Sequence, residues 1–326
     1  MAACWARVLS AAGHTVTTVA GSGEADRLVP ALAWPGGDEG LATPRSDDIA
    51  AAVAGADLVI VENLCSLPLH PSATVVVADV LRGRPALLHH HDLPWQRERF
   101  AGVEGWPPDD PAWAHVTINE TSRADLTDRG IDSTTIRPGI DVHVPPGDRT
   151  AARAALGLTD SDRLLLHPVR AIERKAIPVA IALAEALGAT YWLTGPAEEG
   201  YGPTLAAVLA AARCPTVHRV ASSLTDAYAA ADAVALPSTW EGFGIPLAEA
   251  AVHRRPIAVG RFPAAGELAA LGFRWFPPDD ATPLATFLEE PDENVHDANQ
   301  ALVRTHLSLE RVADDIGRLL DERWGL

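Results

Sequence analysis

The sequence predicts an α/β protein of two doubly wound domains, and three observations carry this prediction. The chain has 326 residues, which is more than one hydrophobic core usually supports. Short apolar runs alternate with amphipathic stretches in both halves, as in parallel sheets covered by helices. The polar, proline-bearing segment VPPGDRT from Val144 interrupts this alternation like an interdomain linker. We therefore expect two facing Rossmann-like domains with a cleft between them.

The first half, residues 1–143, contains four runs that predict strands. They are TVTTVA from Thr15, DLVIVE from Asp57, PALLHH from Pro85 and HVTI from His115. Helices are expected over residues 3–13, 47–54, 71–81 and 120–129. The chain thus enters this domain at a helix, without the first strand, which is central in a doubly wound sheet. Absence of this strand should leave a hole in the sheet, so we expect either that the true start lies upstream or that the sheet of this domain is rebuilt.

The second half, residues 144–306, repeats the alternation. Strands are predicted in RLLLHPV, TYWLTG, TVHRV and AVALP, and helices from Ile177, near Leu205, near Ala227 and from about Gly244. Residues 307–326 form a last helical pattern with apolar positions such as Val312 and Ile316. This helix is long enough to reach back to the first domain.

Composition narrows the class of partner. The net charge of -17 disfavours nucleic acid and anionic membranes, and no basic patch offsets it. Cys4, Cys65 and Cys214 are too few and too far apart for a disulfide framework or a zinc motif. No membrane span or signal peptide is predicted, so we expect a cytoplasmic protein without an integral membrane segment. The oligomeric state is not readable from the sequence.

The most informative segment is PSTWEGFGIPLAEA, which follows Leu236 and leads from a strand through a glycine-rich loop into a helix. Pro246 fits only the first turn of that helix, so the helix starts near Gly244 and its free N–H groups favour an anion. Glu241 lies just before the helix and Glu249 about one turn inside it, so the two can grip different parts of one ligand. Helix capping and solvated carboxylates are the alternative interpretation.

This segment resembles the family 4 glycosyltransferases of GT-B fold, whose mark is two glutamates separated by seven residues. Glu241 and Glu249 match that spacing. The resemblance implies that the second glutamate binds the nucleotide ribose, and that the first, with the loop backbone, contacts the donor sugar and phosphate. The donor-binding positions that it implies are Gly242, Phe243, Gly244, Ile245, Glu249 and Gly139, the last within TTIRPGID from Thr134.

A second match lies in RLLLHPVRAIERKAIP. Arg170 follows the first strand of the second domain, and Lys175 stands five residues later. In the family, an arginine and a lysine at this spacing neutralise the donor diphosphate in place of a metal ion. The family usually has glycine where Val169 and Ala176 stand here. Surface pairing with Glu173 and its neighbours is the alternative. We expect Lys175→Ala to reduce turnover far more than folding, because a partly exposed lysine contributes little to a core.

The first domain contributes HHHDLPWQRERF from His89, at the carboxyl end of a predicted strand. The resemblance implies that His91 contacts the donor sugar near the reacting carbon and that Asp92 orients it. Two alternatives stay open: the histidines are buried and hydrogen-bonded, or the run binds a metal. Alternate residues of a strand point to opposite faces, so the three cannot all share one role.

Together, these matches identify the chain as a candidate retaining, metal-independent hexosyltransferase. We expect a UDP- or GDP-linked sugar as donor. The acceptor is expected to be a hydroxyl group of an unknown small molecule, glycan or lipid that the first domain binds. The predicted catalytic residues are His91, Asp92, Arg170, Lys175 and Glu241, with no metal ligand and no cofactor besides the nucleotide sugar. A catalytically impaired nucleotide-sugar-binding protein and another GT-B enzyme, such as a nucleotide-sugar epimerase, are the alternatives.

Overall fold

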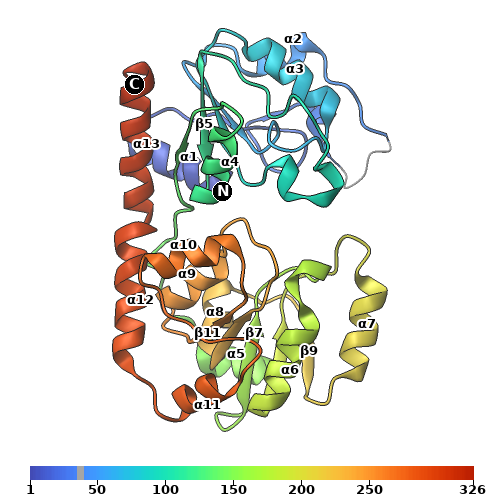
Figure 1. Cartoon of the computed structure of the whole chain (residues 1–326), viewed down its shortest axis with the longest axis vertical. Coiled ribbons are helices and arrows are strands. Elements are labelled where there is room, and N and C mark those ends of the chain that lie inside the picture. Colours follow the sequence, from blue (N-terminus) through green and yellow to red (C-terminus); the bar gives the residue numbers. More distant parts are fainter. Residues whose placement is uncertain (35–39) are drawn as a thin grey trace. The chain divides into compact units, whose positions relative to one another are not determined.

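The computed structural model describes residues 1–34 and 40–326, and the chain divides into two compact units. Unit 1 comprises Met1–Gly139 and Leu309–Leu326, and unit 2 comprises Ile140–Ser308. Each unit is a parallel β-sheet with helices on its faces (Figure 1). No helix in the described part of the chain is both long and apolar enough to span a bilayer.

Unit 1 is built on a four-stranded parallel sheet with the order β3-β4-β5-β6. Its strands are β3 (Val59–Glu62), β4 (Ala86–His90), β5 (Trp113–Thr117) and β6 (Ser133–Thr135). Its α-helices are α1 (Ala2–Ala11), α2 (Ser46–Ala52), α3 (Pro71–Leu81), α4 (Glu120–Thr127) and α13 (Leu309–Trp324). Three short 3-10 turns complete the unit: η1 (Pro30–Leu32), η2 (Pro94–Gln96) and η3 (Glu98–Phe100).

The two faces of this sheet bury two separate cores, because alternate strand residues point to opposite sides. Ala86 and Leu88 pack with residues of α2 and α3, whereas Leu87 packs with residues of α1 and α13. The final helix therefore covers one face of unit 1, where Val312 and Ile316 are buried.

The predicted strand from Thr15 is largely absent. Only β1 (Val19–Ala20) forms there, and it pairs with β2 (Arg27–Leu28) in a two-stranded sheet of its own. The strands β3 to β6 form a second, continuous sheet, of which β3 is an edge. The strands of unit 1 thus lie in two separate parallel sheets, as expected for a doubly wound sheet that lacks its central strand.

Unit 2 holds a five-stranded parallel sheet with the order β11-β10-β7-β8-β9. Its strands are β7 (Arg163–His167), β8 (Ala189–Leu193), β9 (Thr216–His218), β10 (Ala233–Leu236) and β11 (Ile257–Val259). Its helices are α5 (Arg149–Leu156), α6 (Ile177–Leu187), α7 (Gly202–Ala211), α8 (Leu224–Ala230), α9 (Ile245–Val252), α10 (Pro263–Ala270), α11 (Thr282–Glu289) and α12 (Glu293–His306), with the 3-10 turn η4 (Glu173–Lys175). The strands β8 and β10 are buried along their whole length, as strands covered on both faces must be.

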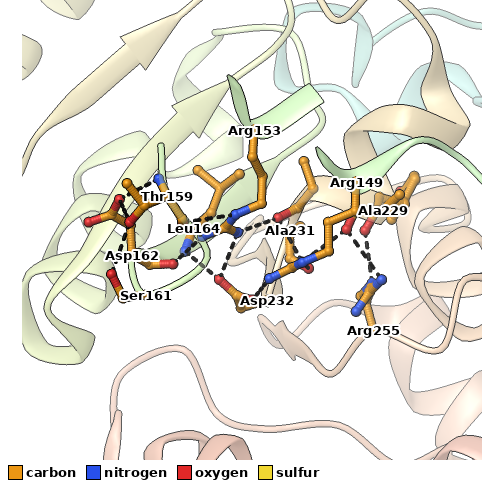
Figure 2. Close-up of polar contacts among 12 residues, drawn as sticks. Arg149, Arg153, Thr159, Ser161, Asp162, Leu164, Ala229, Ala231, Asp232 and Arg255 are labelled. Carbon is orange, nitrogen blue, oxygen red and sulfur yellow. Dashed lines mark hydrogen bonds and ion pairs between the residues drawn. The ribbon is translucent and has the colours of Figure 1, made fainter. Parts of the chain in front are cut away.

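Three arginines stabilise the carboxyl end of α8. Figure 2 shows Arg149, Arg153 and Arg255 reaching the last carbonyl groups of this helix and the residue that follows it. Asp232 accepts hydrogen bonds from Arg149 and Arg153 and from the amide of Leu164. A helix end exposes unpaired carbonyls and a negative partial charge, so these cations satisfy both needs. The arrangement links the end of α8 to α5 and, through Asp232, to the start of β7.

Candidate functional site

The loop between β10 and α9 has the geometry that its sequence predicts. The helix begins at Ile245, with Pro246 in its first turn, and Gly244 precedes it in the left-handed region with φ 96°. A Cβ atom at Gly244 would also meet the ring of Phe262 at 3.2 Å. Both the backbone conformation and the neighbouring ring therefore require glycine at this turn. The loop lies at the carboxyl edge of the sheet, which is where parallel α/β sheets bind ligands.

Glu241 is the centre of a buried cluster at this edge. Its Oε1 accepts from Lys175 Nζ at 2.5 Å and from Ser238 Oγ at 2.6 Å. Its Oε2 lies 3.4 Å from Nη1 of Arg174, which also donates to the carbonyl of Trp240 at 2.8 Å. Two neighbouring strand ends thus supply both the cations and the carboxylate, so the sequence match at Lys175 and Glu241 corresponds to direct contact.

Lys175 is only 8% exposed, which contradicts our expectation of a partly exposed lysine that contributes little to folding. Burial lowers the pKa of Lys175, the Glu241 carboxylate raises it in part, and the charges of Arg174 and Arg170 lower it further. The effect extends to His167 behind it, where complete burial and then the Lys175 charge bring the pKa to about 3. The ion pair of Lys175 and Glu241 is therefore part of the buried interior of unit 2, and it affects the pKa of a neighbouring side chain.

Arg170 lies farther out than Lys175. Its guanidinium donates to Glu198 Oε2 at 2.6 Å, and the two side chains are 51% and 39% exposed. An exposed pair of this kind contributes little to stability, about 0–1 kcal/mol. Its charge nevertheless acts on Lys175, whose pKa it lowers. Arg170 is thus free to exchange its carboxylate partner for another anion at small cost.

Glu249 is held in α9 by Tyr228 of α8, whose hydroxyl donates to Oε2 at 2.8 Å. Burial raises the pKa of Glu249, and the Tyr228 hydrogen bond lowers it in part. The other oxygen, Oε1, has no partner among the described residues, yet it is not a buried atom. The Tyr228 ring is itself fixed by stacking on His253, with centroids 4.8 Å apart. One oxygen of Glu249 is therefore anchored while the other can accept from a ligand hydroxyl.

In unit 1, His91 is bound from two sides by the end of β3. Glu62 Oε2 lies 2.8 Å from His91 Nε2 and 3.1 Å from His89 Nδ1, and the side chain of Asn63 accepts from the His91 amide at 2.9 Å. Asp92, which we expected to orient His91, instead accepts from Arg97 at 2.9 Å. The partner that orients the His91 ring is thus Glu62.

The three histidines divide between the faces of the sheet, as strand geometry requires. His89 and His91 share one face with Glu62. His90 lies on the other, where Ser66 Oγ is 2.7 Å from its Nδ1 and His115 Nδ1 is 2.9 Å from its Nε2. Burial lowers the pKa of His90 well below the ordinary value. The structural alternative therefore holds for His90.

A metal ion has one candidate place among the described residues. The ligand atoms of Glu62, His89 and His91 lie within 4.8 Å of one another. Two imidazoles and a carboxylate are a donor set that transition metals accept. The same three atoms, however, already form two hydrogen bonds, so the set is also satisfied without an ion.

The remaining predicted donor-binding positions differ in exposure. Phe243 is buried and Ile245 is exposed. Gly242, which precedes both, has an intermediate exposure. Gly139 has a packing role: a Cβ atom there would lie 3.0 Å from Leu309 and 3.0 Å from Val312. It is therefore glycine because α13 approaches it closely.

Comparison with solved structures identifies the fold of the chain. A glycosyltransferase structure from Rickettsia africae superposes with a TM-score of 0.71 at 15% identity, covering 98% of this chain and 93% of that one. The chain has the GT-B fold. A UDP-glucose complex of Anabaena Alr3699/HepE superposes with a TM-score of 0.64 at 21% identity, covering 84% of this chain and 82% of that one. Such low identities establish the fold alone.

Sequence comparison finds similarity to glycosyltransferases over part of the chain. Residues 171–321 match the family model described as "Glycosyl transferases group 1". Mannosylglucosylglycerate synthase of Petrotoga mobilis is 26% identical over 270 residues, which are 67% of this chain. The match spans 62% of the length of that relative. The family match includes Lys175, Glu241 and Glu249, and it begins just after Arg170.

Sequence reasoning missed two members of these sites. Arg174 stands next to Lys175, so its basic side chain was visible in ERK, but only the fold shows that it reaches Glu241 and Trp240. Glu62 ends the run DLVIVE and pairs in register with His89. The signal that could have found it is the carboxyl end of a neighbouring strand, since such ends meet at one edge of a parallel sheet.

Proposed function

We propose that this GT-B protein is a glycosyltransferase that moves a hexosyl group from a nucleotide-diphosphate sugar to an acceptor hydroxyl with retention of anomeric configuration. The contact of Lys175 with Glu241, beside Arg174, carries the proposal, because it places positive charge and a carboxylate together at the carboxyl edge of the unit 2 sheet. The match of residues 171–321 to the group 1 glycosyltransferases supports it.

In this proposal, Arg170 and Lys175 neutralise the donor diphosphate and the charge that grows on it as the sugar leaves. Lys175 is buried and held by Glu241, and a positive group fixed in a poorly solvated site stabilises such charge strongly. Glu241 and the backbone of Gly242 to Ile245 contact the transferred sugar and the phosphate, and the free oxygen of Glu249 accepts from the ribose hydroxyls. For unit 1, the proposal keeps the expectation, implied by the family resemblance, that His91 contacts the donor sugar.

The proposed reaction needs no metal ion. The cations of the cluster provide the charge that a divalent ion provides elsewhere, and the donor phosphate itself can take the proton of the acceptor hydroxyl. Turnover should therefore persist in EDTA. Complete loss of turnover in EDTA, with recovery on adding Mg²⁺ or Mn²⁺, would contradict this part of the proposal.

The donor is testable first. UDP- and GDP-linked hexoses are the proposed class, and a thermal-shift panel of nucleotides and nucleotide sugars identifies the member that binds, because a ligand of the native state raises the melting temperature. Calorimetry with the corresponding nucleotide should then show weaker binding by Glu249→Ala. Product analysis by NMR, which reports the anomeric configuration, tests retention.

The acceptor panel should begin with glycerate and its glycosides, since a relative is a mannosylglucosylglycerate synthase. Slow hydrolysis of the donor without any acceptor would separate an enzyme from a protein that only binds nucleotide sugars. Nucleotide binding without hydrolysis or transfer across the panel would favour the binding protein.

A further inference from the structure

The second site of interest lies in unit 1, at the Glu62, His89 and His91 cluster. Glu62 ends β3, His89 lies opposite it in register on β4, and His91 follows two residues later on the same face. One carboxylate oxygen of Glu62, Oε2, is hydrogen-bonded to both imidazoles: it lies 3.1 Å from His89 Nδ1 and 2.8 Å from His91 Nε2. The convergence of two rings on one oxygen requires an explanation.

The charge of Glu62 follows from these contacts. Burial raises the pKa of Glu62, but the hydrogen bonds from His89 and His91 outweigh burial and bring the pKa to about 2. The carboxylate is ionised at neutral pH and can only accept hydrogen bonds. Each imidazole nitrogen that faces it must therefore carry a proton.

This requirement fixes the chemistry of His91. With Nε2 protonated toward Glu62, a neutral imidazole carries its lone pair on Nδ1. Within the described parts of the chain, Nδ1 of His91 has no hydrogen-bond partner, and it is not among the buried polar atoms. His89 differs, since its remaining nitrogen, Nε2, is buried and without a partner within the same residues. Only His91 can present a nitrogen to a ligand.

The backbone of the same loop adds a second constraint. Asn63 adopts a left-handed conformation with φ 59°, and its side chain accepts from the amide of His91 at 2.9 Å. Few non-glycine residues adopt this conformation, and asparagine is favoured among them. Glu62 and Asn63 thus hold the ring and the main chain of His91 together.

We propose that Glu62 is a positioning residue that fixes the His91 imidazole with its Nε2–H directed into the protein, so that Nδ1 is the atom offered to the substrate. The proposal deepens the function proposed above and rests on it, because His91 must contact the transferred sugar. A neutral Nδ1 accepts a hydrogen bond from a sugar hydroxyl, whereas a protonated one donates. The tautomer selected by Glu62 therefore decides which sugar groups His91 can bind.

Two substitutions separate the charge of Glu62 from its ability to accept a hydrogen bond. Glu62→Met removes both, and Glu62→Gln keeps an accepting oxygen without the charge. Long-range ¹H–¹⁵N spectra of the histidine rings report the tautomer directly, with His91→Gln identifying the signal. The wild-type chain should show Nε2–H for His91, Glu62→Met should show a mixture of tautomers, and Glu62→Gln should keep the preference in part.

Kinetics give the second readout. Glu62→Met should reduce kcat for the donor by about 10- to 100-fold, the rate equivalent of one charge-assisted hydrogen bond, with a smaller change in KM.

The matched control is Glu104→Gln, an exposed glutamate of the same unit, which should leave spectra and kinetics unchanged. In the His91→Gln background, Glu62→Met should have little further effect on kcat, since a positioning residue acts through His91. Circular dichroism of each variant shows that the fold is kept.

Three results would overturn the proposal. The first is an Nδ1–H tautomer of His91 in the wild-type chain, and the second is that Glu62→Met and His91→Gln reduce kcat independently of each other. The third is stoichiometric binding of Zn²⁺ or Mn²⁺ that Glu62→Met abolishes. The last would make the cluster a metal site. An absence of donor turnover in the wild-type chain, with the expected tautomer, would instead contradict the proposed function and leave the role of Glu62 in holding the ring intact.

Discussion

Lys175→Met separates the ion pair of the candidate site from the packing around it. Methionine keeps most of the volume of the lysine stem but removes the ammonium group, which lies 2.5 Å from Glu241. The two side chains are only 10% and 9% exposed, so solvent cannot replace the lost partner. Glu241 still keeps Ser238 at 2.6 Å and Arg174 at 3.4 Å. The substitution therefore leaves a partly compensated buried carboxylate.

The expected cost follows from this geometry. Removing one partner of a buried ion pair costs about 3–5 kcal/mol, and the remaining contacts of Glu241 favour the lower end, about 3 kcal/mol of the free energy of unfolding. For a domain of this size, each kcal/mol lowers the melting temperature by roughly 2–4 °C, so a decrease of about 6–12 °C is expected. Urea unfolding and differential scanning calorimetry measure the two quantities, and donor turnover should fall at the same time.

Arg170→Met is the matched control, because its pair with Glu198 is exposed. It should lose turnover with less than about 1 kcal/mol of stability. The reasoning fails if Lys175→Met melts within 2 °C of the wild type, roughly the smallest shift that 1 kcal/mol produces, since the pair would then not stabilise the fold. It also fails if Lys175→Met retains near wild-type turnover, since Lys175 would then not serve the donor.

Three further predictions concern single positions. His167, buried beside Tyr191, should make the chain less stable in acid, because its pKa of about 3 in the folded state lies below the unfolded value. The stability present above about pH 6.5 is then lost as pH falls, by about 2 kcal/mol at pH 5. The variant His167→Gln should therefore show less change in the free energy of unfolding across a urea-unfolding series at pH 5–8. Ala176→Gly should raise stability by up to about 1 kcal/mol, because Ala176 is held at φ 50°, and an unchanged or lower urea midpoint would contradict this. Gly139→Ala should destabilise the chain by about 1 kcal/mol through its 3.0 Å approach to Leu309, and equal melting temperatures would show that α13 can yield.

Unit 2 was the more predictable half of the fold. The runs at Arg163, Thr190 and Ala233 are continuous and apolar, and each became a strand of the sheet because burial on both faces leaves few alternatives. The helix over Arg149–Leu156 was not predicted, and its first two residues were taken as the end of the linker. Its polar face is explained only by the arginines that reach α8 from it.

Unit 1 shows where local pattern fails. The segment from Thr15 is rich in β-branched residues, yet half of it is exposed and only Val19 and Ala20 pair. Strand propensity describes a fit to a half-buried surface, not the presence of a neighbouring strand. The partner of His91 was missed for a related reason, because Glu62 is distant in sequence and only the register of β3 against β4 brings it near.

The ion pairs of Arg170 and Lys175 in unit 2 differ in burial, and this difference suggests different roles for the two predicted diphosphate-binding residues. Lys175 would have to leave a buried carboxylate to bind a phosphate directly, and its burial makes that exchange costly. Arg170 gives up only an exposed contact with Glu198, which is worth about 0–1 kcal/mol. Under the proposed function, Arg170 is therefore the cation suited to close on an arriving diphosphate, whereas Lys175, fixed by Glu241, would act through its charge from a set position. A site arranged in this way can bind an anion by moving one exposed side chain, without exposing a charge in its interior.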